Sequence, residues 1–287
     1  MNEIKRVSPA KINLFLEVIN KRDDGYHNLS SLMSFCNFGD SLQVKKSKDF
    51  VFKIDGPFAN DLNKADNIII KAINEIEYLI KKKLNVEIRL TKNLPISSGM
   101  AGGSSNAATI IKCIDDLYKI NITKEQLNRL LISLGSDVPF CFFGKTALVS
   151  GKGEKIEYTN FMPEYFVLLV NPRVNISTKT IFKKLKINIK KNNKSFKKKF
   201  DKKKIIDVLK NRKNDLEVPA AFQCKIILDI LKILNENTKA IFSRMTGSGA
   251  TCFGLYRNLE DLNKAYDILE TEYGDFWIKR ARIINKI

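Results

Sequence analysis

The sequence predicts a mixed α+β protein of two domains. Segments with the apolar content of β-strands are interleaved with segments that carry helix start and stop signals, and this mixture recurs in both halves of the 287 residues. The chain is long enough for one large domain or two ordinary ones, each with its own core. Because the composition changes across residues 153–163, we predict domains at residues 1–155 and 156–287.

The individual elements are predicted from local signals. Strand-like segments, dense in apolar residues or alternating, are residues 8–18, 41–54, 86–90, 165–170, 252–256 and 277–283, and residues 140–149 form a further apolar segment. Helix-like segments are residues 66–83, 107–117, 123–134, 221–235 and 259–273, with another beginning at Ser177 or Thr178. Thr123 is the expected N-cap of its helix. We place His27, the one histidine, on a polar loop.

Composition restricts the class of protein. Hydrophobic residues make up 44% and charged residues 28%, which is ordinary for a globular protein. No run of about 18 apolar residues occurs, so no membrane span is expected, and residues 1–6 lack the apolar core of a signal peptide. The five scattered cysteines form no C-x-x-C pair: Cys36, Cys113, Cys141, Cys224 and Cys252. We therefore expect reduced thiols and a cytoplasmic location.

The net charge of +19 leaves a nucleic-acid partner open as an alternative. Much of the excess lies in residues 183–213, which are crowded with lysine and asparagine. Phe196 and Phe200 are the aromatic residues there, too few for a stacking platform, and the pattern equally indicates a solvated surface. Nucleic-acid binding is therefore not expected to be the main function. A basic field would also attract anionic nucleotides.

A glycine-rich stretch at residues 94–108 lies between a strand-like and a helix-like segment. Gly99, Gly102 and Gly103 allow positive φ and close approach of a ligand to the backbone. Ser104 and Ser105 stand where a helix N-cap is expected. A turn at the positive end of a helix dipole attracts phosphate, so we predict a nucleotide phosphate loop. The alternative is a connecting loop with a serine cap.

Three segments in this order resemble the GHMP kinase superfamily: residues 9–13 (Pro-Ala-Lys-Ile-Asn), residues 94–108, and residues 245–251 (Met-Thr-Gly-Ser-Gly-Ala-Thr). Residues 24–29 (Asp-Gly-Tyr-His-Asn-Leu) and 134–139 (Leu-Gly-Ser-Asp-Val-Pro) narrow the resemblance to the branch that acts on a cytidyl sugar alcohol. The spacing fits from end to end, so the resemblance covers nearly the whole chain.

The resemblance implies an N-terminal ribosomal-S5-like domain and a C-terminal ferredoxin-like domain, with the active site between them. It implies that ATP, with Mg²⁺, phosphorylates the 2-hydroxyl of a methylerythritol unit in the non-mevalonate route to isoprenoid precursors. We expect a cytoplasmic monomer or weak homodimer. No carboxylate cluster with ligand spacing is visible, so no metal ligand is named; magnesium often relies on substrate phosphates and water.

Residue by residue, the resemblance implies that Lys11 and Asp137 are the catalytic pair. Asp137 would orient the acceptor hydroxyl or act as its base, and Lys11 would keep that carboxylate ionised. An ordinary surface ion pair is the structural alternative. The implied nucleotide-binding residues are Asn67, Lys92, Pro95, Ile96, Ser97, Ser98, Gly99, Met100, Ala101, Gly102, Gly103, Ser104 and Ser105.

The implied acceptor-side residues are Asn13, Tyr26, His27, Thr178 and Phe182, with Tyr26 and Phe182 sandwiching cytosine. A superfamily kinase for homoserine or mevalonate is the runner-up, but such an enzyme has no use for a cytosine reader at Tyr26 and His27. The predicted phosphate loop departs from the family pattern at three positions. The family usually has glycine or alanine at the positions of Ser97 and Ser98, and glycine at the position of Ala101. Such a departure costs little at negative φ and is unfavourable at positive φ. No family counterpart accounts for the lysine-rich residues 183–213.

Overall fold

The computed structural model describes residues 3–62, 66–159, 163–185 and 205–287. The chain forms two compact units, which we call unit 1 (Met1–Ala10, Phe38–Ile96 and Ala101–Gly144) and unit 2 (Lys11–Asn37, Ser97–Met100 and Lys145–Ile287). Two long strands, β1 (Glu3–Lys21) and β2 (His27–Lys46), each contribute residues to both units. The predicted domains, residues 1–155 and 156–287, are consecutive segments, whereas each compact unit combines several segments of the chain. The predicted domain division stays a prediction.

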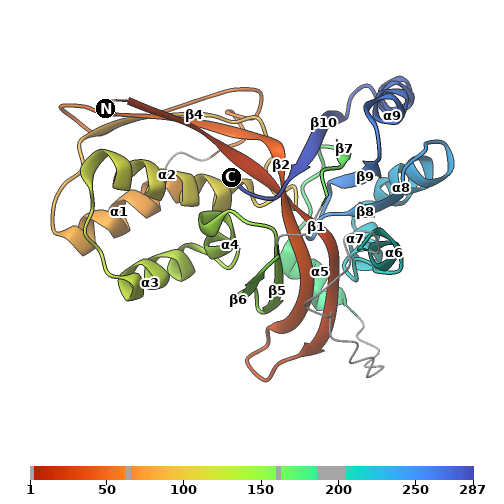
Figure 1. The fold of residues 1–287 in the computed structure, drawn as a ribbon, viewed down its shortest axis with the longest axis horizontal. Coiled ribbons are helices and arrows are strands. Elements are labelled where there is room, and N and C mark those ends of the chain that lie inside the picture. Colours follow the sequence, from red (N-terminus) through yellow and green to blue (C-terminus); the bar gives the residue numbers. More distant parts are fainter. Residues whose placement is uncertain (1–2, 63–65, 160–162, 186–204) are drawn as a thin grey trace. The chain divides into compact units, whose positions relative to one another are not determined.

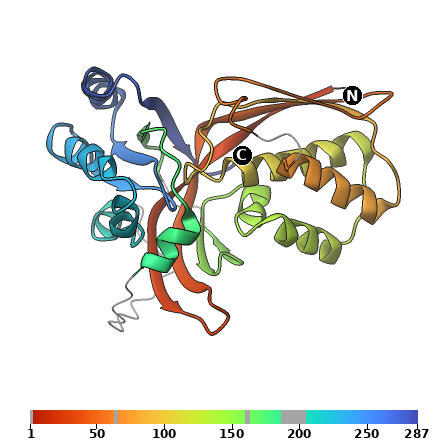
Figure 2. The same ribbon diagram turned by 180° about the vertical axis from the view of Figure 1, so that it is seen from behind.

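Unit 1 combines a short sheet with four helices. The second half of β2 pairs antiparallel with β4 (Val86–Thr91), and β4 pairs in parallel with β3 (Val51–Asp55). The helices are α1 (Ile68–Ile80), α2 (Gly102–Tyr118), α3 (Lys124–Leu134) and α4 (Val138–Phe143). Figures 1 and 2 show them gathered on one side of β2 and β4. Ile73 and Ile110 belong to the fully buried core.

Local capping explains where two of these helices begin. Thr123 and Gln126 form a capping box at the start of α3, in which each side chain accepts a hydrogen bond from the other residue's backbone N–H (2.8 and 3.2 Å). This confirms the predicted N-cap. The Asn67 side chain caps α1 by accepting a hydrogen bond from the Ile69 N–H at 2.9 Å.

Unit 2 is built on an antiparallel sheet in the order β10–β7–β9–β8. Its strands are β7 (Phe166–Asn171), β8 (Phe242–Met245), β9 (Cys252–Tyr256) and β10 (Trp277–Ile284). Helix α8 (Ile226–Glu236) packs against β8 and β9, and α9 (Leu259–Glu272) packs against β7 and β10 (Figure 1). This strand order and helix placement confirm the expected ferredoxin-like arrangement.

The remaining elements of unit 2 flank that sheet. The first half of β2 pairs with β10 and with β5 (Ala147–Gly151), which pairs with β6 (Lys155–Tyr158). Among the described residues, three short helices complete the unit: α5 (Thr178–Lys184), α6 (Ile205–Lys210) and α7 (Glu217–Ala221). Figure 2 shows α5 beside the β1–β2 hairpin.

Several predicted boundaries were wrong. His27 begins β2 and does not lie on a loop, because Leu29 and the residues after it pair with β5. The single strand predicted at residues 41–54 is interrupted after Lys46, before β3 begins. The apolar residues 140–149 are divided by Gly144, whose φ of +63° ends α4 ahead of β5. The helix predicted at residues 221–235 begins later than expected, because Ala221 is the last residue of α7 and α8 begins at Ile226.

The lysine-rich stretch at residues 183–213 is partly structural. Residues 186–204 of this stretch lie outside the described residues. Its C-terminal part forms α6, which buries Ile205, Ile206 and Leu209. The interpretation of the whole stretch as a solvated surface was therefore wrong for α6. No helix in the described part of the chain combines the length and apolarity needed to cross a membrane.

Candidate active site

The glycine-rich loop forms the N-terminus of helix α2. The helix begins at Gly102, and its N-cap, Ala101, lies in the left-handed region (φ +53°, ψ 34°). No side chain of the described residues caps this end, and the Ser105 N–H donates to the Ala101 carbonyl at 2.9 Å. The predicted N-cap role of Ser104 and Ser105 was therefore wrong, since the first helical turn already includes them. The first N–H groups of α2 therefore have no side-chain cap, and such groups are free to bind a ligand.

The solvent-exposed point of this turn is Gly103. Apart from its chain neighbours and the backbone of its own helix, a Cβ at Gly103 would meet only the Cγ2 atom of Ile68, at 3.7 Å, among the described residues within 4 Å. A Cβ at Gly102 would contact Leu94 Cδ1 and Lys92 Nζ, each at 3.4 Å. The turn is thus supported from within at Gly102 and open at Gly103.

Two departures from the family pattern fall on strained positions. Ser97 has a φ of +49°, and Ala101 has a φ of +53°. A side chain in this region is unfavourable by about 1–2 kcal/mol per residue. Ser98 is buried, and its carbonyl accepts a hydrogen bond from the Thr251 N–H at 3.4 Å. The loop is held in its conformation despite the strain at these two positions.

The other residues of the loop anchor it. Pro95 and Met100 are buried, whereas Ile96 and Ser104 are both half-buried. The Ser105 hydroxyl is also buried and has no hydrogen-bond partner among the described residues. A buried hydroxyl without a partner in a glycine-rich turn is a group suited to a ligand's polar atoms.

Lys92 lies in a buried cluster around Asp40, a residue that the sequence did not indicate. Its ammonium group donates to Asp40 Oδ2 at 2.7 Å and to the Leu94 carbonyl at 2.6 Å. Burial lowers the pKa of Lys92, and the Asp40 carboxylate opposes that effect. Lys92 therefore supports the start of the glycine-rich loop.

Lys11 and Asn13 lie two residues apart in β1, within unit 2. The Lys11 ammonium donates to Asn13 Oδ1 at 2.9 Å and to the Gly99 carbonyl at 3.3 Å, and the Lys11 backbone N–H donates to the Met100 carbonyl at 2.9 Å. The Asn13 amide donates to the Ser31 hydroxyl at 2.8 Å. The structure confirms that Lys11 and Asn13 share a face, and it places Lys11 against Gly99 and Met100 of the glycine-rich loop.

A second glycine turn, at residues 245–251, packs against the first. Thr246 Oγ1 accepts a hydrogen bond from the Asn13 N–H at 2.9 Å. A Cβ at Gly99, whose φ is +74°, would stand only 2.2 Å from the Thr246 carbonyl oxygen. The Asn214 amide donates to the carbonyls of Met245 and Gly247, both at 2.8 Å. The two turns thus meet backbone to backbone.

Two charged side chains that the sequence did not indicate, Arg244 and Glu217, support this second turn. Arg244 donates to the carbonyls of Leu14, Leu209 (3.1 Å) and Arg212 (2.6 Å). Glu217 accepts a hydrogen bond from the Met245 N–H at 3.4 Å. Burial raises the pKa of Glu217 to about 7, although the nearby Arg244 charge favours ionisation.

The expected acceptor-side residues lie around the start of β2 and α5. The rings of His27 and Phe182 are stacked, with centroids 5.2 Å apart and planes at 29°. Tyr26 is 61% exposed, and Lys152 Nζ lies 4.8 Å from the centre of its ring. Thr178 Oγ1 lies 2.7 Å from the Ser248 hydroxyl of the second glycine turn. Burial, and to a lesser degree the Lys21 charge, lowers the pKa of His27.

Asp137 belongs to unit 1 and immediately precedes α4. Its carbonyl accepts the Cys141 N–H at 3.0 Å, and its side chain makes no capping hydrogen bond to the helix. The residue is half-buried after the turn at Gly135, where φ is +148°. The carboxylate is thus presented on a short, fixed turn.

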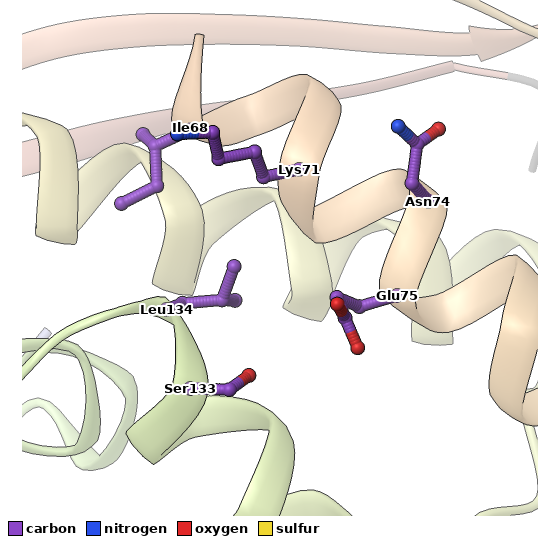
Figure 3. A pocket seen from close by; sticks show the side chains of 6 residues that line it. All are labelled: Ile68, Lys71, Asn74, Glu75, Ser133 and Leu134. Atoms are coloured by element: carbon purple, nitrogen blue, oxygen red, sulfur yellow. The ribbon is translucent and has the colours of Figure 1, made fainter. Parts of the chain in front are cut away.

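Unit 1 contains a cavity of about 350 Å³, and Figure 3 shows the side chains that line it. Helix α1 contributes Ile68, Lys71, Asn74 and Glu75, and the end of α3 contributes Ser133 and Leu134. Ile68 is the residue whose side chain also borders Gly103. Lys71 and Glu75 carry opposite charges and leave this cavity without a net positive charge, whereas the first N–H groups of α2 carry the partial positive charge of a helix N-terminus.

Comparison with known proteins identifies the class. The model of the GHMP kinases N terminal domain matches residues 67–145, and that of the GHMP kinases C terminal domain matches residues 196–275. A solved homoserine kinase from Cytophaga hutchinsonii shares this fold with a TM-score of 0.70 at 15% identity, covering 100% of this chain and 96% of that one. The chain is a mixed α+β protein of the GHMP kinase fold, as predicted.

More similar proteins define the family within that class. The 4-diphosphocytidyl-2-C-methyl-D-erythritol kinase of Chelativorans sp. (strain BNC1) is 34% identical, over 98% of this chain and 96% of the relative. A crystal structure of 4-(cytidine 5'-diphospho)-2C-methyl-D-erythritol kinase has a TM-score of 0.79 at 25% identity, covering 98% of this chain and 99% of that one. The chain belongs to the 4-diphosphocytidyl-2-C-methyl-D-erythritol kinase family.

Proposed function

We propose that this chain transfers the γ-phosphoryl group of ATP to the 2-hydroxyl of 4-diphosphocytidyl-2-C-methyl-D-erythritol, in the non-mevalonate route to isoprenoid precursors. The observation that carries this proposal is the uncapped N-terminus of α2 in a chain of this kinase family. The N–H groups of Gly102, Gly103 and Ser104 would hold phosphate oxygens at the positive end of the helix dipole. Phosphoryl transfer depends mainly on such positioning and charge neutralisation.

Magnesium, when bound, would neutralise charge on the phosphates. The unpartnered Ser105 hydroxyl in the first turn of α2 fits a role beside such an ion. The described residues hold no group of three or more His, Cys, Asp or Glu side chains suited to a metal, so phosphates and water would supply the other ligands.

For the acceptor, we propose that Asp137 orients the hydroxyl and takes its proton, while the Lys11 ammonium favours charge developing on oxygen. Asn13 holds Lys11 in place. Tyr26 and Phe182 would take cytosine between their rings, beside the His27 stack, and Thr178 would offer its hydroxyl nearby. We further propose a cytoplasmic monomer or weak homodimer; all five cysteines are buried free thiols, compatible with a reducing compartment.

The test is ATP consumption by the purified chain with Mg²⁺ and a panel of acceptors: the cytidyl substrate, homoserine and mevalonate. We expect turnover with the cytidyl substrate alone. Turnover with homoserine or mevalonate, and none with the cytidyl substrate, would place the chain's activity elsewhere in the superfamily and refute the specific proposal.

A further inference from the structure

One fully buried carboxylate lies next to the phosphate loop without belonging to it. Asp40 follows Gly39 in β2 and is 0% exposed. Its Oδ1 accepts hydrogen bonds from the backbone N–H groups of Asn93 and Leu94, both at 2.8 Å. Its Oδ2 accepts from Lys92 Nζ at 2.7 Å and from the Asn106 amide at 2.9 Å. Four donors satisfy both oxygens of an ionised carboxylate.

These donors come from both ends of the loop. Lys92, Asn93 and Leu94 lead from β4 into the glycine turn, whereas Asn106 lies in the second turn of α2, after Ser105. A single side chain therefore ties the chain entering the loop to the helix leaving it. Because hydrogen bonds to a charged group are stronger than neutral ones, this tie depends on the carboxylate charge.

The cluster also lies directly beneath the proposed phosphate site. Lys92 Nζ is 3.4 Å, and Asp40 Oδ2 is 3.6 Å, from where a Cβ of Gly102 would stand. Gly102 is the first residue of α2, whose N–H group is one of the three assigned to phosphate. A change at Asp40 is thus transmitted to the nucleotide through one layer of contacts.

Resting on the proposed function, we propose that Asp40 is a positioning residue for ATP. Its carboxylate fixes Lys92 and clamps the two ends of the phosphate loop, so that the N–H groups of α2 are preorganised for phosphate. Asp40 does not touch the nucleotide; it acts through Lys92, Leu94 and Asn106.

A purely structural brace is the competing explanation, and unit 1 offers a matched control. Glu77, near the end of α1, accepts hydrogen bonds from the Leu84 N–H at 2.8 Å and from Lys83 Nζ at 2.7 Å, and its side chain is 11% exposed. It braces the chain that enters β4, whereas Asp40 braces the chain that leaves it. Glu77→Gln should therefore lower the stability of the fold without changing its affinity for ATP.

The experiment compares the wild type with Asp40→Asn, Asn106→Leu and Glu77→Gln. Titration calorimetry measures the affinity of a non-hydrolysable ATP analogue with Mg²⁺, steady-state kinetics measures KM for each substrate, and thermal unfolding sets a temperature at which every variant is folded. In Asp40→Asn the new amide group faces two donors, Lys92 and Asn106. We expect the ATP analogue to bind about tenfold more weakly or worse, with KM for the cytidyl acceptor unchanged.

Asn106→Leu keeps the Asp40–Lys92 pair and removes the link to α2, so we expect a smaller loss of ATP affinity in the same direction. If Asp40→Asn does not fold, the ATP affinity of Asn106→Leu tests the proposal. ATP affinity at the wild-type level in folded Asp40→Asn or in Asn106→Leu, or an equal loss in Glu77→Gln, would overturn the proposal. Because the readout is analogue binding, it remains valid if the acceptor proves to be another alcohol.

Discussion

Replacing Gly103 by alanine should separate stability from ATP binding. The residue lies in the first turn of α2, where an added Cβ meets the Ile68 methyl group at 3.7 Å, an ordinary van der Waals contact. Alanine is favoured over glycine inside a helix by about 0.5–1 kcal/mol. We therefore expect unchanged or slightly higher stability, with Tm raised by roughly 2 °C.

The same methyl group would stand where we place a phosphate oxygen. Losing one hydrogen bond to a charged group costs about 1.5–3 kcal/mol, which corresponds to roughly 10- to 150-fold weaker ATP binding. Calorimetry with a non-hydrolysable ATP analogue and thermal unfolding measure the two terms. Wild-type ATP affinity in a stable Gly103→Ala protein would refute the placement of phosphate at this turn.

Gly99→Ala is the contrasting variant. Gly99 has a φ of +74°, and its new Cβ would lie 2.2 Å from the Thr246 carbonyl oxygen and 2.9 Å from the Gly249 nitrogen. The left-handed backbone costs about 1–2 kcal/mol and the overpacking about 1–3 kcal/mol, so we expect a loss of stability of roughly 2–5 kcal/mol. Stability equal to that of Gly103→Ala would contradict the packing of the two glycine turns.

Three further predictions follow from the site. Tyr26→Ala should raise KM for the cytidyl acceptor by about 5- to 150-fold, because stacking contributes about 1–3 kcal/mol. Tyr26→Phe should keep most of the affinity. An equal rise of KM in both variants would exclude stacking. Asp137→Asn should lower kcat by about 10²- to 10⁴-fold with ATP still bound. In the Asp137→Asn, Lys11→Met double variant, kcat should fall by less than the product of the two single-variant losses. A near-normal kcat in Asp137→Asn would exclude Asp137 from the chemical step. Because the folded-state pKa of Glu217, about 7, exceeds its ordinary value of 4.5, its contribution to stability is full below about pH 4.5 and falls by roughly 3 kcal/mol as pH rises past 7. Urea unfolding of wild type and Glu217→Gln at pH 5 and pH 8 should show this dependence in the wild type alone, and parallel curves would refute it.

The parts of the fold that the sequence predicted are those specified by neighbouring residues. Thr123 and Gln126 are three residues apart and form the capping box that starts α3. Start and stop signals likewise located α9. The first half of β2 was missed because its apolar pattern is interrupted by polar residues, among them Ser31 and Ser34, which are buried through partners elsewhere in the chain.

The candidate site shows the same contrast between features set by neighbouring residues and features set by residues distant in the sequence. The glycines between a strand-like and a helix-like segment predicted a turn at the start of a helix, and phosphate binding at that turn stays a prediction. They did not predict that α2 begins at Gly102, which depends on the left-handed conformation of Ala101. Asp40 could not be predicted, because its partners lie on β4 and α2, far along the chain. The stack of His27 on Phe182 likewise joins residues distant in sequence.

The central claim, phosphorylation of one particular hydroxyl, is tested most directly by the identity of the product. The wild-type chain is incubated with ATP, Mg²⁺ and 4-diphosphocytidyl-2-C-methyl-D-erythritol, and the product is examined by ³¹P and ¹³C NMR. We predict a new phosphomonoester signal with phosphorus coupling to the tertiary C2 carbon and an intact cytidine diphosphate. A phosphate on another carbon, or ADP formed without a phosphorylated acceptor, would contradict the account.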